Sequence, residues 1–301
     1  MEGIKKIWYN GQFLDFKKGK IFLLSHALHY GSAVFEGIRA YLTEKGPAVF
    51  RLDDHLKRLF FSASCLRIKI PFSFEELKKA ILKTIELNGQ KECYIRPIVF
   101  YGEGSMGLYP KEVKINCAII TWPWGKYLEK EKVKVKVSRF IRLHPRSVES
   151  KAKISGYYVN SIFASLEAKE KGYDEALLLD YRGFLAEGPG ENIFIVKNKK
   201  VFTPALGSIL PGITRKTVIE ILRDLKIPCQ EKNISLTELK EAQEAFFTGT
   251  AVEICPIYQV GKKKIEKGKI GPFSQMIKEK YQRIVHGREK KYLKWLTFVK
   301  N

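Results

Sequence analysis

The chain has 301 residues, of which 45% are apolar, 12% aromatic and 29% charged, a composition typical of folded globular proteins. This excludes disordered, collagenous and low-complexity classes. Its 54 Lys and Arg against 32 Asp and Glu give a formal net charge of +22, which makes nucleic acid, an anionic membrane and acidic substrates candidate partners. The length exceeds what one hydrophobic core usually fills, so two domains are expected.

The sequence predicts neither a secretory signal peptide nor a transmembrane helix. The first twelve residues are interrupted by Lys5, Lys6 and Asn10, so they contain no apolar signal core. The longest apolar stretch, 117–124, is interrupted by Pro123 and is far shorter than the roughly 18 residues that a membrane span requires. We therefore expect a cytoplasmic protein without a membrane partner.

The five cysteines predict free thiols rather than disulfides or a metal site. Their number is odd, they lie far apart, and neither CxxC nor HExxH occurs in the chain. Most of them lie in apolar segments, which favours buried thiols in a reducing compartment. No bound metal is expected, because a zinc site needs Cys or His ligands paired at short spacing.

The first 121 residues predict a small N-terminal domain of strands and helices, an α+β arrangement. The Asn10-Gly11 dipeptide favours a type I′ turn between two strands, and the spacing of Ser73 and Glu76 is that of a helix capping box. The expected elements are strands 4–9 and 12–16, a helix capped by Asp53, a helix over 73–89, and strands 93–101 and 114–121.

Residues 122–130 mix Pro and Gly with aromatic and charged side chains, which predicts an interdomain loop, and 131–301 then form the larger C-terminal domain. Alternating Lys and Val predict a half-exposed first strand in this domain. The expected elements are strands 132–137, 175–181, 184–187 and 192–196, helices 160–171 and 214–225, a capping box at Ser235 and Glu238, and a basic helix from Met276.

Several common catalytic motifs are absent. There is no GxxxxGK[ST], no GxGxxG after a strand and no GxSxG, so nucleotide-binding, kinase and α/β-hydrolase functions are disfavoured. Turns rich in Gly or Thr occur instead at 187–192, 210–215 and 248–251. The second of these opens a helix, where backbone N–H groups and the Thr214 hydroxyl can bind an anion, although a plain turn has the same pattern.

Seven segments match those of a known enzyme family, in order and at similar spacing. They are SHALHYGSAVFEGIRAY (25–41), VFRLDDHLKRL (49–59), YIRP (94–97), the segment around Lys153, EGPGENIF (187–194), LPGITR (210–215) and TGTAVE (248–253). The chain resembles the branched-chain amino-acid aminotransferases, which are class IV, fold-type IV enzymes. The resemblance implies a two-domain α/β (α+β) fold, with a pseudo-barrel of strands in the C-terminal domain and pyridoxal 5'-phosphate between the domains.

The resemblance also implies a role for each cofactor-binding residue. Lys153, rather than Lys151, matches the lysine that bonds to the cofactor and moves the substrate proton as base and then acid. Glu187 matches the carboxylate at the pyridine nitrogen, and Tyr158 matches the tyrosine at the phenolate oxygen. The implied phosphate ligands are Arg51, Ile213, Thr214 and Thr250.

The implied reaction transfers the amino group of L-leucine, L-isoleucine or L-valine to 2-oxoglutarate, which becomes L-glutamate. By resemblance, the substrate α-carboxylate meets Tyr94 and the amides of Thr250 and Ala251. The γ-carboxylate of glutamate meets Arg96 and Tyr30, where Tyr30 comes from a neighbouring subunit, so a dimer or a hexamer is expected. The implied walls of the apolar pocket are Phe35, Trp124 and Tyr127.

Two alternatives remain open from the sequence. One is another class IV enzyme, namely a D-amino-acid or (R)-amine aminotransferase or an aminodeoxychorismate lyase, but Tyr30, Arg96 and EGIRAY argue against these. The other is a basic nucleic-acid-binding protein. Residues 261–301 hold 13 Lys or Arg and 3 Glu, so much of the excess charge lies away from the seven segments, and no lysine cluster is interleaved with stacking aromatics. We therefore expect no nucleic-acid partner.

Overall fold

The computed structural model describes residues 3–124 and 130–299, and these divide into two compact units. The first unit contains 3–124, 152–157 and 283–299, and the second contains 130–151 and 158–282. Two late segments that the sequence analysis placed in the C-terminal domain therefore pack in the first unit. They do so because Ile154 bridges Val34 and because the last strand pairs with an early one.

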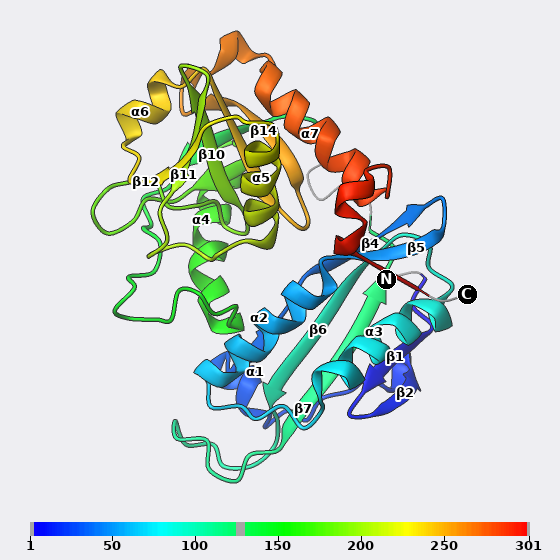
Figure 1. Ribbon diagram of the computed structural model, residues 1–301. Helices are drawn as coiled ribbons and strands as arrows, with labels where there is room; N and C mark the ends of the chain where they lie inside the picture. Colours follow the sequence, from blue (N-terminus) through cyan, green and yellow to red (C-terminus); the bar gives the residue numbers. More distant parts are fainter. Residues whose placement is uncertain (1–2, 125–129, 300–301) are drawn as a thin grey trace. The chain divides into compact units, whose positions relative to one another are not determined.

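The first unit is built on an antiparallel sheet (Figure 1) with the strand order β16-β5-β4-β6-β7-β1-β2, and β3 pairs with β6. Its strands are β1 (Lys6–Tyr9), β2 (Gln12–Asp15), β3 (Ala33–Phe35), β4 (Ile38–Thr43), β5 (Gly46–Phe50), β6 (Cys93–Tyr101), β7 (Ile115–Trp122) and β16 (Leu296–Phe298). Its helices are α1 (His26–Tyr30), α2 (Leu52–Cys65), α3 (Phe74–Asn88) and the short 3-10 helices Phe16–Lys18, Ser155–Tyr157 and Lys290–Trp295.

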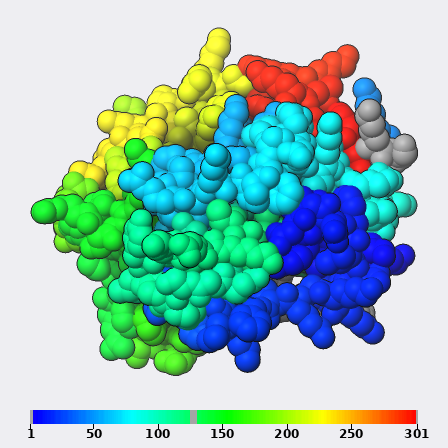
Figure 2. All heavy atoms as spheres, turned by 90° about the horizontal axis from the view of Figure 1, so that it is seen from below, coloured from blue at the N-terminus to red at the C-terminus, as the bar shows by residue number. Residues whose placement is uncertain are grey.

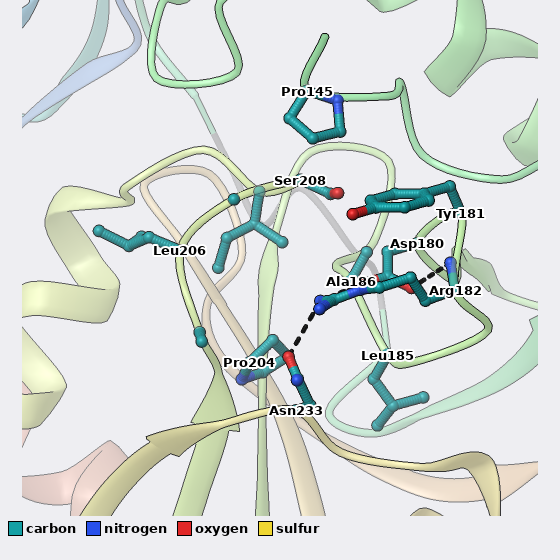
Figure 3. Close-up of a pocket in the computed structure, with 13 residues that line it drawn as sticks. Pro145, Asp180, Tyr181, Arg182, Leu185, Ala186, Pro204, Leu206, Ser208 and Asn233 are labelled. Carbon is teal, nitrogen blue, oxygen red and sulfur yellow. Dashed lines mark hydrogen bonds and ion pairs between the residues drawn. The ribbon is translucent and has the colours of Figure 1, made fainter.

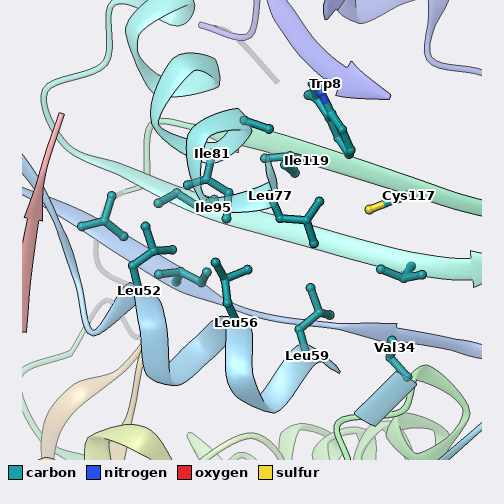
Figure 4. Packing of buried hydrophobic residues seen from close by; sticks show 14 of the residues in the cluster. Trp8, Val34, Leu52, Leu56, Leu59, Leu77, Ile81, Ile95, Cys117 and Ile119 are labelled. Carbon is teal, nitrogen blue, oxygen red and sulfur yellow. The ribbon is translucent and has the colours of Figure 1, made fainter. Parts of the chain in front are cut away.

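The hydrophobic core of the first unit lies between α2, α3 and the sheet. Figure 4 shows Leu56 from α2, Leu77 from α3 and Ile95 from β6 directed toward one another, and all three are fully buried. Burying a side chain of this size contributes roughly 1.5–3 kcal/mol. The apolar positions of both helices recur at helical spacing, so the two helices share one core with the strands.

The N-terminal hairpin is fixed to the end of α3. Asn10 and Gly11 both have positive φ values, 46° and 89°, which confirms the predicted type I′ geometry. The Asn88 side chain accepts the N–H groups of Lys5 and Lys6 at 2.8 Å each. In Figure 2 the dark blue hairpin accordingly lies beside the cyan residues of α3.

The capping predictions for the two helices have different outcomes. The Ser73 and Glu76 capping box is present, and α3 ends at Gly89 in a left-handed conformation, as predicted. Asp53, in contrast, is not the cap of α2. The helix begins one residue earlier, and its N-cap is Arg51, which has φ 54° and no side-chain capping bond. The prediction was wrong because Asp53 and Asp54 stabilise the first turn as helical residues, through their charge.

The second unit is also built on one sheet, with the order β12-β11-β10-β13-β14-β8-β9, and β15 pairs with β14. Its strands are β8 (Val133–Val137), β9 (Glu175–Leu177), β10 (Asn192–Lys197), β11 (Lys200–Pro204), β12 (Cys229–Lys232), β13 (Glu244–Gly249), β14 (Glu253–Val260) and β15 (Lys263–Lys264). Its helices are α4 (Tyr158–Glu170), α5 (Ile213–Asp224), α6 (Leu236–Glu241), α7 (Pro272–Val285, whose last three residues belong to the first unit) and the 3-10 helix Glu266–Gly268.

This second sheet bends back toward its own middle strands. β9 is shorter than the strand predicted over 175–181, and the chain beyond it turns so that Leu179 bridges Leu185 and Glu187 bridges Asn192 at the start of β10. The centre of the sheet is packed with aromatic side chains, since Phe194 and Phe246 stack with ring centroids 5.2 Å apart. The capping box at Ser235 and Glu238 is present, as predicted.

The cysteine prediction is confirmed within the described residues. All five cysteines are free thiols, and Cys93, Cys117 and Cys255 are buried. Burial raises the pKa of each of these three thiols to about 12, so they are poor nucleophiles. Across 3–124 and 130–299, no His, Cys, Asp and Glu side chains cluster as metal ligands, and no helix is long and apolar enough to cross a membrane.

Candidate active site

Lys153 belongs to the first unit, where its backbone is held between β3 and α2. Its N–H donates to the Ser62 hydroxyl at 2.9 Å, and its carbonyl accepts the N–H of Phe35 at 3.2 Å. The ammonium group lies 4.9 Å from the centre of the Phe35 ring. Lys153 is half-buried, whereas Lys151, the other candidate lysine, is exposed. The structure therefore gives the two lysines clearly different surroundings.

A close approach of two glycines fixes the chain just after Lys153. Gly156 donates its N–H to the carbonyl of Gly31 at 3.1 Å. Gly31 ends α1 with φ 65°, and a Cβ atom on it would lie 2.6 Å from the Gly156 Cα. Only glycine fits this position, because both the left-handed backbone and the lack of space exclude a side chain. The contact holds the Lys153 segment next to Tyr30, the last residue of α1.

A fully buried carboxylate lies next to Phe35. Glu36 accepts two bonds from Arg58, at 2.6 and 2.8 Å, and a third from His55 Nδ1 at 2.7 Å. Burial alone would raise the pKa of Glu36, but the Arg58 charge and the His55 bond hold this pKa well below its usual range. Burial lowers the pKa of His55. Glu36 opposes this shift, and the charges of Arg58 and Lys153 add to it, so the charged form of His55 is disfavoured.

One face of α2 therefore looks toward the Lys153 segment. His55, Arg58 and Ser62 are spaced so that they share this face, and each contacts Glu36 or Lys153. Arg51 lies before the first turn and has other partners. Its guanidinium pairs with Asp54 at 2.6 Å and stacks on Trp295 at 4.4 Å. Arg58, which was not singled out from the sequence, thus contacts the carboxylate next to Phe35, whereas Arg51 contacts Asp54 and Trp295.

An aromatic cluster surrounds Arg96. The guanidinium carbon lies 4.6 Å from the Phe35 ring centre and 5.3 Å from that of Tyr94. Tyr94 in turn contacts Trp124, with ring centroids 4.4 Å apart. A Cβ atom on Gly37 would lie 1.9 Å from the Tyr94 hydroxyl, so glycine makes room for this side chain. The structure thus brings four predicted substrate residues together.

Two other predicted substrate residues are placed differently. Tyr30 lies in the same unit but is 45% exposed, and its hydroxyl donates to the Met106 carbonyl at 2.8 Å. Tyr127 lies outside the described residues. Arg96 Nε is buried and, among the residues that the structure describes, has no hydrogen-bond partner. A buried donor without a partner is costly, which fits a position where an anionic ligand accepts this bond.

In the second unit, Glu187 is buried and held by three chain segments. Its Oε1 accepts from Arg142 Nε at 2.7 Å, and its Oε2 accepts from Asn192 Nδ2 at 3.0 Å. The N–H of Leu210 lies 3.2 Å from Oε2. Glu191, the other acid in the turn, instead accepts the N–H of Gly190 at 3.0 Å. Glu187 therefore connects the turn at 187–192 with the loop that leads into α5.

The start of α5 has the features of an anion site. Gly212 is its N-cap and provides no side-chain capping bond, while Ile213 and Thr214 are buried in the first turn. A Cβ atom on Gly212 would lie 1.9 Å from the Asn192 side-chain oxygen, so the backbone approaches this strand closely. Thr250 and Ala251 are half-buried after β13, and the buried Thr248 hydroxyl has no partner among the described residues. These N–H groups and hydroxyls are suited to a phosphate.

Tyr158, the predicted partner of the cofactor phenolate, is the first residue of α4 and is half-buried. The residues after it connect this helix to Glu187, because Asn160 and Ser161 both accept bonds from Arg142. The structure therefore joins two predicted cofactor residues of the second unit through one arginine. Arg142 was missed by sequence reasoning, since an arginine after a strand carries no local signal of its partner.

A cavity of about 170 Å³ lies beside this region (Figure 3). Its walls include Ala186 and Ile209, which directly precede Glu187 and Leu210. Its charged groups already satisfy each other, because Arg182 donates to Asp180 at 2.8 Å and to Asn233 at 3.0 Å. The cavity is lined by none of the predicted site residues.

Comparison with known proteins identifies the family. The family model for amino-transferase class IV matches residues 33–260. The chain belongs to the class IV aminotransferase family. It is 41% identical over 298 residues to a branched-chain-amino-acid aminotransferase of Pseudomonas aeruginosa, covering 98% of this chain and 97% of that protein. This family membership confirms the resemblance that the seven segments carry.

Solved structures of class IV enzymes share the fold. The branched-chain aminotransferase of Thermoproteus uzoniensis, crystallised with norvaline, is 45% identical with a TM-score of 0.95, covering 98% of this chain and 99% of that one. The branched-chain amino acid aminotransferase of Escherichia coli is 37% identical with a TM-score of 0.96, covering 99% of this chain and 100% of that one. The predicted mixed α/β fold is therefore confirmed.

Proposed function

We propose that this protein is a branched-chain amino-acid aminotransferase that uses pyridoxal 5'-phosphate. It transfers the amino group of L-leucine, L-isoleucine or L-valine to 2-oxoglutarate and yields branched-chain 2-oxo acids and L-glutamate. The observation that carries this proposal is similarity over nearly the whole chain to enzymes of that name. The described residues fit the cofactor, since they provide a half-buried lysine, a buried acid and an uncapped helix start.

Each end of the cofactor has a suitable group in this chain. When bound, the cofactor supplies an electron sink for the charge that develops at the substrate Cα. Lys153 Nζ would hold the cofactor and, once the substrate amine has displaced it, would take the proton from the substrate Cα and later return it. Glu187 would hold the pyridine nitrogen, Tyr158 would donate to the phenolate oxygen, and Ile213, Thr214 and Thr250 would hold the phosphate.

One arginine is expected to complete the phosphate site. The family resemblance implies Arg51, but its guanidinium pairs with Asp54 and stacks on Trp295. Arg58 lies on the α2 face that contacts Glu36 and Lys153, so the contacts favour Arg58. Replacing each arginine by lysine separates the two. We expect Arg58→Lys to weaken cofactor affinity about tenfold or more, through loss of a charge-assisted bond, and Arg51→Lys to leave the affinity within about twofold.

The aromatic cluster of the first unit suits the substrate. Phe35, Tyr94 and Trp124 form an apolar wall, and burying a branched side chain against it favours leucine over alanine by roughly 1.5–3 kcal/mol. Arg96 Nε, which is buried and has no hydrogen-bond partner among the described residues, provides a donor for the γ-carboxylate of glutamate. We propose that Tyr127, which lies outside the described residues, completes the wall, and that Tyr94, Thr250 and Ala251 bind the α-carboxylate.

We further propose a homo-oligomer, at least a dimer, in the cytoplasm. Tyr30 is 45% exposed in its own unit, as expected for a residue that completes a neighbour's site. The same unit exposes large apolar side chains at Phe22, Leu23, Leu108 and Tyr109, and side chains of this kind are often covered where subunits associate. Sedimentation of the holoenzyme tests this proposal, and a monomer at micromolar concentration would contradict it.

The reaction is tested by adding L-leucine or D-alanine separately to the purified protein loaded with pyridoxal 5'-phosphate. We expect L-leucine alone to change the absorbance of the bound cofactor and to form glutamate when 2-oxoglutarate is added. A response to D-alanine alone would sink the proposal in favour of another class IV activity. Salt-sensitive retention on DNA without bound cofactor would favour the nucleic-acid alternative.

The catalytic lysine is tested with a matched pair of variants. We expect Lys153→Ala to lower kcat by about 10²- to 10⁴-fold or more, which is the contribution of a positioned proton-transfer group. Lys151→Ala removes an exposed lysine two residues away and should leave kcat unchanged. Borohydride reduction and peptide mapping should place the cofactor adduct on Lys153, and an adduct on another lysine would refute the assignment.

A further inference from the structure

Arg142 is a buried cation that holds Glu187 and is not among the site residues proposed above. It follows β8 in the second unit, and its own N–H donates to the Leu179 carbonyl at 2.7 Å. Its side chain is 11% exposed, and its Nε donates to Glu187 Oε1 at 2.7 Å. The strand pairing of β8 and the bond to Leu179 therefore fix the backbone from which this side chain extends.

The guanidinium has partners on more than one edge. Nη1 lies 3.3 Å from Asn160 Oδ1 and 3.3 Å from Ser161 Oγ, both in the first turn of α4. Asn160 is itself oriented, because its Nδ2 donates to the Ile141 carbonyl at 3.0 Å. A planar guanidinium with partners on both Nε and Nη1 has little freedom to rotate. The carboxylate of Glu187, which it binds, is therefore held in one orientation.

The opposite carboxylate oxygen of Glu187 is fixed by neutral donors. Asn192 Nδ2 and the N–H of Leu210 reach Oε2 at 3.0 and 3.2 Å. Arg142 thus supplies a charge-assisted bond to Glu187, and such a bond is stronger in a buried site than in water. Because Asn160 and Ser161 lie in the same first turn as Tyr158, the same guanidinium also ties Glu187 to the helix that carries Tyr158.

We propose that Arg142 is a positioning residue for the transamination reaction, which fixes the orientation of Glu187 and its register with Tyr158. This inference rests on the proposed function. Arg142 acts through Glu187 and α4 and does not itself touch the substrate. A lysine in its place would keep the positive charge but would lose the planar set of donors that reaches Glu187, Asn160 and Ser161 together.

Two variants separate position from charge. In Arg142→Lys we expect kcat for L-leucine and 2-oxoglutarate to fall by about 10- to 100-fold, the loss typical of an orienting partner behind a functional group. KM should change little, and the pH midpoint of the absorbance of the bound cofactor should stay near that of the wild type, because the charge is kept. In Arg142→Met we expect the same loss of kcat, together with a higher pH midpoint for the absorbance of the bound cofactor. The midpoint rises because loss of a nearby positive charge makes deprotonation less favourable.

Lys136→Met is the matched control in the same unit. Lys136 pairs with Glu167 on α4 at 2.9 Å and is 19% exposed, so its loss also removes a partly buried cation that contacts this helix. We expect its kcat to stay within about twofold of the wild type. Wild-type kcat in Arg142→Lys, or an equal loss in Lys136→Met, would overturn the positioning role. Failure of both Arg142 variants to fold would also overturn it, because the role would then be structural.

The proposed function fails in a different way from this inference. If the wild-type protein neither binds pyridoxal 5'-phosphate nor converts L-leucine, the proposed function is refuted before any variant is made. If the wild type is active and Arg142→Lys equals it, only the positioning role is refuted.

Discussion

Each unit of this protein buries one glutamate against one arginine, and the two clusters differ in what completes them. In the first unit, Glu36 is fully buried and is shared by Arg58 and His55. In the second, Glu187 pairs with Arg142, and its other donors are the Asn192 amide and a backbone N–H. The first cluster therefore contains a titratable partner, whereas the partners named for the second do not change charge near neutral pH.

This difference indicates different tasks. Glu36, the residue after β3, binds His55 and Arg58 on α2, which suits a scaffold that holds the Arg58 side chain in place. The Glu187 cluster lies among loops and the start of a helix, which suits a site that must keep one charge state while protons move nearby. Three measurements test how the two units differ.

The largest expected effect comes from removing the Glu36 charge. Glu36→Gln leaves Arg58 buried without its counter-charge, so the free energy of unfolding should fall by about 3–5 kcal/mol. Denaturant unfolding measures this loss, and hydrogen exchange locates it. Exchange should rise in α2 and β4 but not in β10. The matched variant Glu187→Gln should raise exchange in β10 and the start of α4, and equal patterns in both variants would contradict the separation of the two clusters.

A smaller effect is expected from pH. His55 has a folded pKa below its ordinary value of 6.5, so its contribution to stability is complete above pH 6.5 and is lost as the pH falls. The free energy of unfolding should decrease by up to about 1.4 kcal/mol per pH unit below that value, the limit for one proton. His55→Gln should flatten this slope in urea titrations between pH 7 and pH 5. A variant slope equal to that of the wild type would show that His55 does not titrate on unfolding.

The smallest effects come from the two capping boxes, one in each unit. Ser73→Ala and Ser235→Ala each remove a side-chain bond to the N–H of a glutamate three residues later, at 3.3 and 3.1 Å. Each should cost about 1 kcal/mol, as is usual for loss of an N-cap. Thermal unfolding tests this, with Ser64→Ala as a control, because this exposed serine lies near the end of α2 and caps no helix start. A loss in the control as large as in the cap variants would contradict the capping account.

Local signals made much of the fold predictable. The turn at Asn10-Gly11, both capping boxes and the amphipathic face of α2 depend on residues within one or two turns of each other, and all are present. The Asp53 cap failed because acidic residues favour both the cap and the first turn, and the sequence alone does not distinguish these positions.

The partners of the site residues were much less predictable. Glu36 and Arg58 both lie within segments that carry the family resemblance. Their ion pair joins the end of a strand to a helix, and no periodic pattern in the sequence predicts such a pair. The bond from Arg142 to Glu187 likewise joins residues that are distant in the sequence. Arg51 was chosen as a phosphate ligand because of its place in the VFR segment. That place does not predict that Trp295, near the other end of the chain, stacks on its guanidinium.

The late segments of the first unit have a consequence for synthesis of the chain. β5 pairs with β4 on one side and with β16 on the other. Among the described residues, β16 is one of the last segments to be synthesised. During translation, β5 is therefore an open sheet edge, with unpaired backbone groups that another chain can join. The Lys153 segment, too, must return to a unit whose first strands emerged much earlier. The second unit can assemble from one nearly continuous stretch, so a nascent chain released early should expose the first unit's edge and be prone to aggregation.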